Sequence, residues 1–446
     1  MQDRNVGSGR SVAEDLGRRS PSLGLWAAAA TLLLGFVAAT NRWISWNAGF
    51  RLLLPHDEAD YRVIASSAPH LPSVKLPEQH AQRFPFHYLV GILAHAGGLN
   101  VESTYTVVVI FLAVALAGLL GVVLATIGVS DEVFVICLGV FVLNTYSLRY
   151  YGIAPGMTVD LVFEAGLLVA LLGLLRRSYL VVLTGVVIAT LARQSAVPAS
   201  LAVAAWLCLG PGWREASPRA RIVRAGAVVL LSVVLFVIVV QVATPFSAAT
   251  TPDFSHWTML ADLERLPSGL GDLGQHFLRA ANGLFGVTSL ILAAAAAAKA
   301  RRPRGRLPVE FWWCMLLAAV VVAQPVIFSP EYAAHNETRL AVLAIPALAT
   351  GLGFLLKDLE HQIGRITTTT TLILTAILAV GSLHHLYTVI GTATAKQTVV
   401  LQAITAVCLA AVLLRSTRRP WTPVESIDDQ RVGVISDKAH GEHATE

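Results

Sequence analysis

Long, uninterrupted apolar runs constrain the fold of this chain more than any other feature of its sequence. Each run covers roughly 17–25 residues, the length that an α-helix needs to cross a hydrocarbon core about 30 Å thick. Hydrophobic residues make up 55% of the 446 residues and charged residues only 14%, whereas soluble domains carry about 25% charged residues. A transmembrane barrel would instead need short segments of alternating polarity. The pattern therefore predicts an all-α integral membrane protein.

The apolar runs predict about twelve transmembrane helices. They cover residues 23–41, 104–128, 133–148, 159–175, 179–192, 195–209, 225–243, 276–298, 309–328, 339–356, 366–386 and 398–414. We interpret 23–414 as one polytopic domain between two polar cytoplasmic tails, 1–22 and 415–446. A cleaved signal peptide is the alternative for the first run. That run is longer than the apolar core of a signal peptide, which favours an uncleaved anchor.

Residues 42–103 are predicted to form a long first outer loop. Within it, the apolar segment 84–98 is too short to span a membrane and is interrupted by His87 and His95. We therefore expect an amphipathic helix lying along the membrane surface.

This choice sets the topology, because it puts most basic clusters on one side of the membrane. By the positive-inside rule that side is the cytoplasm. The chain is then a multi-pass protein of the cytoplasmic (inner) membrane, with both termini inside. The excess of arginine over lysine hints at a bacterial source. Other candidate polar stretches of the outer face are 149–160, 244–275 and 329–339.

The basic residues fall in short clusters between apolar runs, so the formal charge of +5 does not indicate a nucleic-acid partner. The four cysteines lie inside apolar runs without metal-ligand spacing and are predicted to be packing residues. They are Cys137, Cys208, Cys314 and Cys408.

The outer loop begins with an acidic cluster, His56-Asp57-Glu58-Ala59-Asp60-Tyr61. Transfer of a sugar to a hydroxyl or amine needs a carboxylate that takes the proton and cations that bind the leaving phosphate. Asp57 and Glu58 are the candidate catalytic residues, since neighbouring acids repel each other and raise one pKa. Asp60 and Tyr61 are candidates for substrate binding. A solvated loop turn is the alternative interpretation.

Three arginines are candidates for the donor phosphate, because a guanidinium group binds phosphate through two hydrogen bonds. They are Arg83, Arg193 and Arg339. Arg193 interrupts an apolar stretch, so it could equally serve to turn the chain. His87 and Arg149 are further candidates for substrate binding on the same face.

Two acidic positions near predicted span boundaries complete the candidate site. Asp160 and Glu164 share one helix face, and an acid pair there is costly unless it faces a polar cavity. Snorkelling to the interface is the alternative for Asp160. Glu337, like Asp160, could orient substrate or a cation, although it could also stabilise a helix N-terminus. His335 precedes it and is a candidate substrate contact.

These motifs resemble those of the GT-C superfamily of polytopic glycosyltransferases. The closest groups are the protein O-mannosyltransferases, the aminoarabinose transferases and the rhizobial lipopolysaccharide transferases. The His56–Tyr61 stretch is similar to the family's "DE-x-x-Y" motif in its first outer loop. Arg83-Phe84-Pro85-Phe86 resembles its proline-containing surface segment. Leu191-Ala192-Arg193-Gln194-Ser195 and His335-Asn336-Glu337-Thr338-Arg339, followed by Pro346, are similar to its later motifs.

The resemblance implies an inverting enzyme in which Asp57 is the catalytic base, with Glu58 beside it. The implied donor is a polyprenyl-phosphate sugar, and the acceptor is a glycan, lipid or protein of the cell envelope. No metal ligand is assigned, and the need for a divalent cation stays open because branches of the family differ. Two departures concern the first loop. Asp57 lies some distance beyond the first span, and Phe-Pro-Phe-His replaces His-Pro-Pro.

Two other classes of function remain. A secondary transporter or a lipid or glycolipid flippase would place ionisable groups in mid-membrane and would often contain inverted repeats. No clear internal repeat is present in the sequence. A non-enzymatic membrane scaffold would need none of the outer acids.

Overall fold

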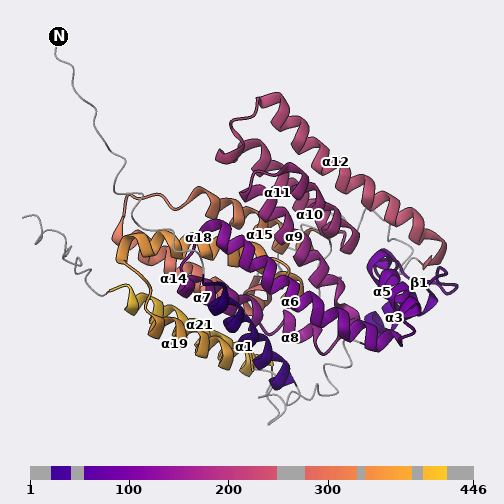
Figure 1. Ribbon diagram of the computed structural model, residues 1–446, viewed down its shortest axis with the longest axis horizontal. Helices are drawn as coiled ribbons and strands as arrows, with labels where there is room; N and C mark the ends of the chain where they lie inside the picture. Colours follow the sequence, from indigo (N-terminus) through magenta and orange to yellow (C-terminus); the bar gives the residue numbers. More distant parts are fainter. Residues whose placement is uncertain (1–21, 42–54, 249–276, 329–336, 384–394, 419–446) are drawn as a thin grey trace, which may run out of the picture.

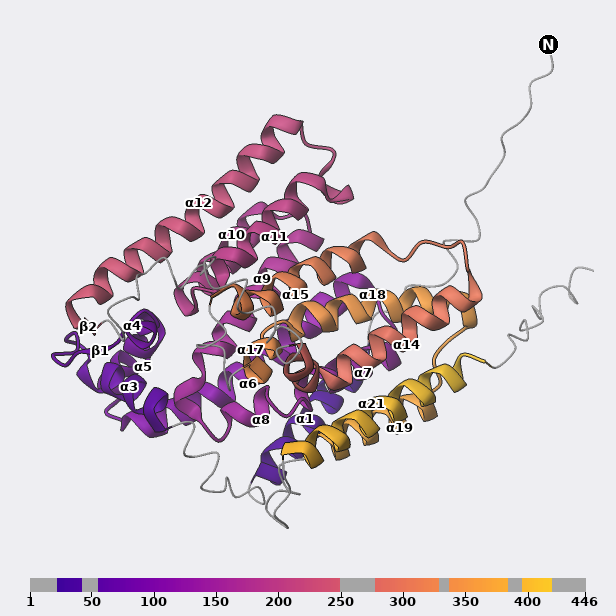
Figure 2. The same ribbon diagram turned by 180° about the vertical axis from the view of Figure 1, so that it is seen from behind.

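The computed structural model describes residues 22–41, 55–248, 277–328, 337–383 and 395–418. The described part of the chain is almost entirely helical (Figures 1 and 2). Its α-helices are α1 (Leu23–Asn41), α3 (Pro55–Ser67), α4 (Glu78–Ala81), α5 (Phe84–Gly97), α6 (Val101–Ile127), α7 (Asp131–Val142), α8 (Leu148–Tyr151), α9 (Val159–Leu175), α10 (Tyr179–Ala192), α11 (Ala196–Leu209), α12 (Pro218–Ala243), α14 (Phe285–Arg301), α15 (Val309–Phe328), α17 (Glu337–Val342), α18 (Ile345–Ile363), α19 (Thr368–Gly381) and α21 (Ala395–Ser416). Three 3₁₀ turns are η1 (Pro155–Met157), η2 (Pro211–Trp213) and η3 (Thr244–Phe246), and the two strands are β1 (Leu76–Pro77) and β2 (Ser247–Ala248).

Five helical stretches of the described chain are long and apolar enough to cross a membrane. They are Leu23–Asn41, Val101–Ile127, Pro155–Leu175, Pro218–Phe246 and Val399–Thr417. A sixth would come from Phe277–Gly283 together with α14, although this pair is bent by 93°. The expectation of an all-α membrane-embedded protein is confirmed at this level, and the count of about twelve spans stays a prediction.

Several predicted spans are shorter or interrupted in the structure. The run 133–148 becomes α7, which ends at Val142, followed by the short α8. The run 339–356 is divided between α17 and α18. The run 366–386 becomes α19, which begins at Thr368 and ends at Gly381. The runs 179–192 and 309–328 coincide with α10 and α15, and the run 195–209 coincides with α11 to within one residue. Hydropathy averaged over a run did not reveal the breaks, because the few polar residues or the proline at a break are outweighed by their apolar neighbours.

The central helix α9 is buried along most of its length and packs most closely against α10. Glycines make this approach possible. A Cβ atom on Gly166 would lie 2.5 Å from the backbone nitrogen of Ala189, and one on Gly185 would lie 2.3 Å from that of Ala170. Helices in lipid associate through such small residues, because apolar burial alone does not favour helix contact over lipid contact.

Residues 55–98 fold onto the ends of α9 and α12 (Figure 1). Strand β1 pairs in parallel with β2, which follows α12, and Lys75 Nζ donates a hydrogen bond to the carbonyl oxygen of Pro245 over 2.8 Å. At α9, the backbone N–H of Gly156 donates to Glu58 Oε1 over 3.3 Å. Residues 55–98 therefore cover one end of the helix bundle.

Basic residues gather at the opposite end of the bundle. Arg177 pairs with Glu215 over 2.7 Å, beyond the C-terminus of α9. Lys357 Nζ donates to the carbonyl oxygen of Ile127, at the C-terminus of α6, over 2.6 Å. This segregation agrees with the relative sidedness expected from the sequence, and the positive-inside rule predicts that the basic end faces the cytoplasm.

Helix α5 coincides with the helix expected over 84–98, and it ends at Gly98 in the left-handed conformation (φ 62°). His87, Val90, Gly91 and Ala94 are buried, whereas Leu89 and Leu93 on another face are exposed. The buried stripe faces α3, so His87 is a packed residue, while His95 is exposed.

Gly91→Ala should destabilise the protein, because an added Cβ would lie 2.0 Å from the backbone oxygen of Ala65 in α3. Overpacking of this kind costs about 1–3 kcal/mol. Thermal unfolding of the purified protein in detergent measures the loss. Gly118→Ala in α6 is the matched control, because nothing lies within 4 Å of its Cβ position. Equal melting temperatures for the two variants would contradict the close contact between α3 and α5.

Candidate functional site

Asp160, in the first turn of α9, is the centre of a fully buried ion cluster. Arg193 Nη1 donates to its Oδ1. Arg339 Nε donates to its Oδ2 over 2.9 Å, and the Tyr151 hydroxyl donates to the same oxygen over 3.0 Å. The carboxylate is therefore held by groups from three elements that lie far apart in the sequence.

Both arginines sit where the helical backbone is interrupted. Arg193 is the C-cap of α10 and is extended (φ −150°, ψ 144°), so it links α10 to α11. Arg339 lies in the short α17, which ends before α18 begins with proline in its first turn. The interruptions bring both guanidinium groups to the N-terminal end of α9, where they meet a buried carboxylate.

A second group of polar residues joins α3 to α4. His80 Nε2 lies 3.0 Å from Asp57 Oδ1, and His80 Nδ1 lies 2.6 Å from Asp60 Oδ2. The His80 ring is buried, while the two aspartates are partly exposed. Burial would raise the pKa of Asp57, but the hydrogen bond from His80 and the charges of His80, Arg339 and Arg83 lower it to about 2. Asp57 is therefore ionised at neutral pH.

The acidic group and the arginine cluster belong to one site. Arg339 and Arg83 both lie close enough to Asp57 to lower its pKa. Arg83 Nη1 donates to the Tyr61 hydroxyl, and among the described residues Arg83 has no carboxylate partner. Three buried guanidinium groups (Arg83, Arg193 and Arg339) therefore lie close to the carboxylates of Asp57 and Asp160.

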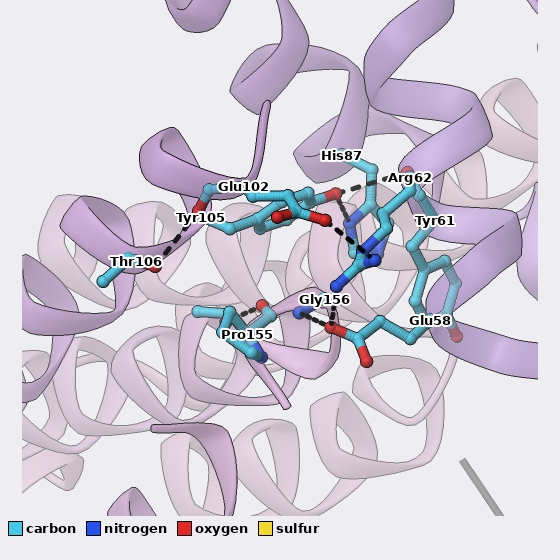
Figure 3. A network of polar contacts seen from close by, with 10 residues as sticks. Glu58, Tyr61, Arg62, His87, Glu102, Tyr105, Thr106, Pro155 and Gly156 are labelled. Atoms are coloured by element: carbon cyan, nitrogen blue, oxygen red, sulfur yellow. Dashed lines mark hydrogen bonds and ion pairs between the residues drawn. The ribbon is translucent and has the colours of Figure 1, made fainter. Parts of the chain in front are cut away.

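A hydrogen-bonded aromatic layer supports Arg83 from α5 and α6. The rings of Tyr61 and His87 stack with centroids 4.1 Å apart. His87 Nδ1 lies 2.8 Å from the Tyr105 hydroxyl, which donates to the backbone oxygen of Tyr61 over 3.3 Å (Figure 3). Burial and the nearby Arg83 hold the pKa of His87 well below its usual value, so this imidazole is neutral.

Glu58 has mainly structural contacts (Figure 3). It accepts the hydrogen bond from Gly156 and pairs with Arg62 over 3.2 Å, and Arg62 also pairs with Glu102 over 3.0 Å. A Cβ atom on Gly156 would lie 2.5 Å from Glu58 Cγ, so glycine is needed for this contact. Of the two adjacent acids, Asp57 is the one that faces the arginines.

The structure thus brings together Asp57, Asp60, Tyr61, Arg83, His87, Asp160, Arg193 and Arg339 from the candidates chosen by sequence. Arg149 lies elsewhere: its guanidinium donates to Thr40 over 2.7 Å, to Asn41 over 2.9 Å and to Ser382 over 3.2 Å. It therefore ties α1 to the end of α19. His335 lies outside the described residues, and of Glu337 only the backbone, at the start of α17, is described.

Sequence reasoning missed His80 and Tyr105. His80 lies in an unremarkable Glu-Gln-His-Ala stretch, and no spacing connects it with Asp57 or Asp60. Tyr105 follows the polar start of an apolar run and looks like an ordinary helix residue. Across the described ranges, no group of three or more histidine, cysteine or acidic residues is arranged to hold a metal ion.

Comparison with known proteins found no relative of this chain. No protein-family model, no curated protein and no solved structure matches the chain. The resemblance to the GT-C superfamily therefore depends on the short motifs quoted above.

Asp160→Asn should cost about 3–5 kcal/mol of stability, because two buried guanidinium groups would lose their counterion. Denaturation of the detergent-solubilised protein measures this change. Glu164→Gln is the matched control, since Glu164 is also fully buried and lies one turn further along α9. Neither of its carboxyl oxygens has a hydrogen-bond partner among the described residues. We expect it to change stability by less than about 1 kcal/mol. The ion cluster would lose its assigned role if Asp160→Asn were as mild as Glu164→Gln.

Proposed function

We propose that this protein is an integral membrane glycosyltransferase of the GT-C type. It moves a sugar from a polyprenyl-phosphate donor to a cell-envelope glycan, lipid or protein at the outer face of the inner membrane. The observation that carries the proposal is the approach of an ionised acid, Asp57, to the buried arginines at the end of the bundle opposite the basic clusters.

The arginines suit the leaving phosphate of the donor. Asp160 holds Arg193 and Arg339 in fixed positions, so little reorganisation is needed when negative charge develops nearby. The guanidinium of Arg83 is bonded to a neutral hydroxyl instead. Its charge is therefore the least compensated of the three, and we assign it the direct contact with phosphate.

Asp57 suits the role of base, with Glu58 supporting it by fixing α3 against η1. A carboxylate with a pKa of about 2 is a weak base towards a free hydroxyl. It can accept the proton late in the reaction, once bond formation to the anomeric carbon has made the acceptor oxygen acidic. The products are the glycoside, the lipid phosphate and one proton, so the step balances without a further reactant.

A secondary transporter or flippase is the second candidate, and one observation favours it. Glu164 is buried within a candidate span, and its carboxyl group has no hydrogen-bond partner in the part of the chain that the structure describes. Ionisable groups inside a membrane often mark ion or proton pathways. Flux of a labelled lipid or solute into liposomes without any lipid-linked sugar would support this candidate, and its loss in Glu164→Gln would support it further.

Arg83→Gln should weaken the binding of polyprenyl phosphate at least tenfold, since a hydrogen bond to a charged group contributes about 1.5–3 kcal/mol. Native mass spectrometry of the protein with added polyprenyl phosphate measures the affinity. Arg62→Gln is the control, because Arg62 is exposed and its ion pairs, among the described residues, are with Glu58 and the exposed Glu102. Unchanged affinity in a folded Arg83→Gln protein would rule out Arg83 as the phosphate contact.

Asp57→Asn should lower sugar transfer by about 10²–10⁴-fold, the usual contribution of a general base. The assay supplies a panel of radiolabelled polyprenyl-phosphate sugars to membranes and follows label in the lipid, glycan and protein fractions. Glu102→Gln, at an exposed acid of the same region, should keep full activity. A scaffold would tolerate both changes. If the protein has a function that does not need sugar transfer, and the Asp57→Asn protein keeps that function in full, the enzyme proposal is contradicted.

A further inference from the structure

His80 is hydrogen bonded on both sides by carboxylates, and this geometry specifies its protonation state. Its Nε2 faces Asp57 and its Nδ1 faces Asp60. A neutral imidazole has one N–H and one bare nitrogen, whereas an ionised carboxylate is only an acceptor. Both contacts are satisfied together when both ring nitrogens carry a proton.

The groups around His80 divide into those that favour its charge and those that oppose it. Asp57 and Asp60 of α3 favour it, while burial of the ring and Arg83 oppose it. Tyr61 presents its ring at 5.4 Å, and His87 of α5 is neutral. The two carboxylates outweigh burial, so the pKa of His80 is raised above its ordinary value.

We propose that His80 is an imidazolium ion that clamps Asp57 to Asp60 and serves as the positioning residue of the acidic group. The clamp occupies Asp57 Oδ1, and Oδ2 has no hydrogen-bond partner among the described residues. It leaves the group of three with one net negative charge. If His80 lost its proton, the group would carry two negative charges, and one of its two hydrogen bonds would break.

The direction of the pH dependence follows from this raised pKa. A histidine whose pKa is higher in the folded than in the unfolded protein stabilises the fold at low pH, and the stabilisation is lost as pH rises through the folded pKa. The clamp should therefore be intact at pH values below the raised pKa of His80 and should open as pH rises through it, whereas Asp57 stays ionised down to a pH near its own low pKa.

Titration by nuclear magnetic resonance tests the protonation state without any assay of activity. The full-length protein is labelled in its histidines, and its ring signals are followed from pH 5 to pH 10 in detergent, with His80→Asn identifying the signal. We expect the His80 signal to titrate above the ordinary pKa of a histidine side chain. Asp60→Asn should lower the pH at which His80 titrates. The proposal is overturned if His80 titrates at or below the ordinary histidine value in the unaltered protein.

Two conservative variants test the positioning role of His80. This second arm of the experiment measures activity, so it depends on the proposed glycosyl transfer. Glutamine at position 80 places an amide near the position of Nε2 and can keep the hydrogen bond to Asp57, whereas asparagine places its amide near Nδ1, towards Asp60. We expect His80→Gln to retain at least tenfold more transfer activity (kcat) than His80→Asn. We expect the activity of the unaltered protein to fall as pH rises through the pKa of His80, and both variants should lose this fall.

The two arms separate the possible failures. If no donor supports transfer, the glycosyltransferase proposal fails while the titration still decides the state of His80. If transfer occurs and His80→Asn keeps both the rate and the alkaline fall, His80 has no positioning role. A purely structural role would lower the yield of folded protein in both variants and leave the pH profile of the remainder unchanged.

Discussion

The burial of one carboxylate, that of Asp160, constrains this end of the bundle more than any other interaction. A charge in a medium of low polarity is very costly unless it is paired and hydrogen bonded. Arg193, Arg339 and Tyr151 provide the necessary partners. Arg193 lies between α10 and α11, and Tyr151 and Arg339 lie in the short helices α8 and α17, so the apolar runs are interrupted at the points where the pairing forms. The breaks in the apolar runs and the site are thus consequences of the same charge.

This coupling explains which parts of the structure were predictable from sequence. The class of fold follows from hydropathy, and the position of α5 follows from an apolar segment too short to span. The break at Arg193 was signalled by a charge within an apolar stretch. The breaks before Pro346 and after Val142 were not predicted, although a proline marks the first and the polar residues Asn144, Thr145 and Ser147 mark the second. Hydropathy measures the free energy of transferring a side chain out of water, and it does not specify the exact path of the backbone.

In the candidate site too, some residues could be identified from the local sequence, whereas the roles of others depend on tertiary contacts. Asp57, Arg193 and Arg339 were identified because a charge beside an apolar run is conspicuous. The role of His80 depends on a turn that returns the chain to α3, and the role of Arg149 depends on α1 and α19. His80 and Arg149 lie in short polar stretches that look alike in the sequence. Only tertiary contacts distinguish the residue that joins the acidic group from the one that fastens helices together.

The charges of the site lie in two layers that differ in their access to water. Asp160 and its arginines are dry, so their interactions are strong and insensitive to salt, and they suit a phosphate that must be held in one position. Asp57 and Asp60 are partly exposed, whereas His80 between them is buried. A transfer reaction that leaves an anion on the donor and releases a proton from the acceptor needs this separation. A base buried beside the arginines would be held as their counterion, as Asp160 is, and could not accept a proton without releasing them.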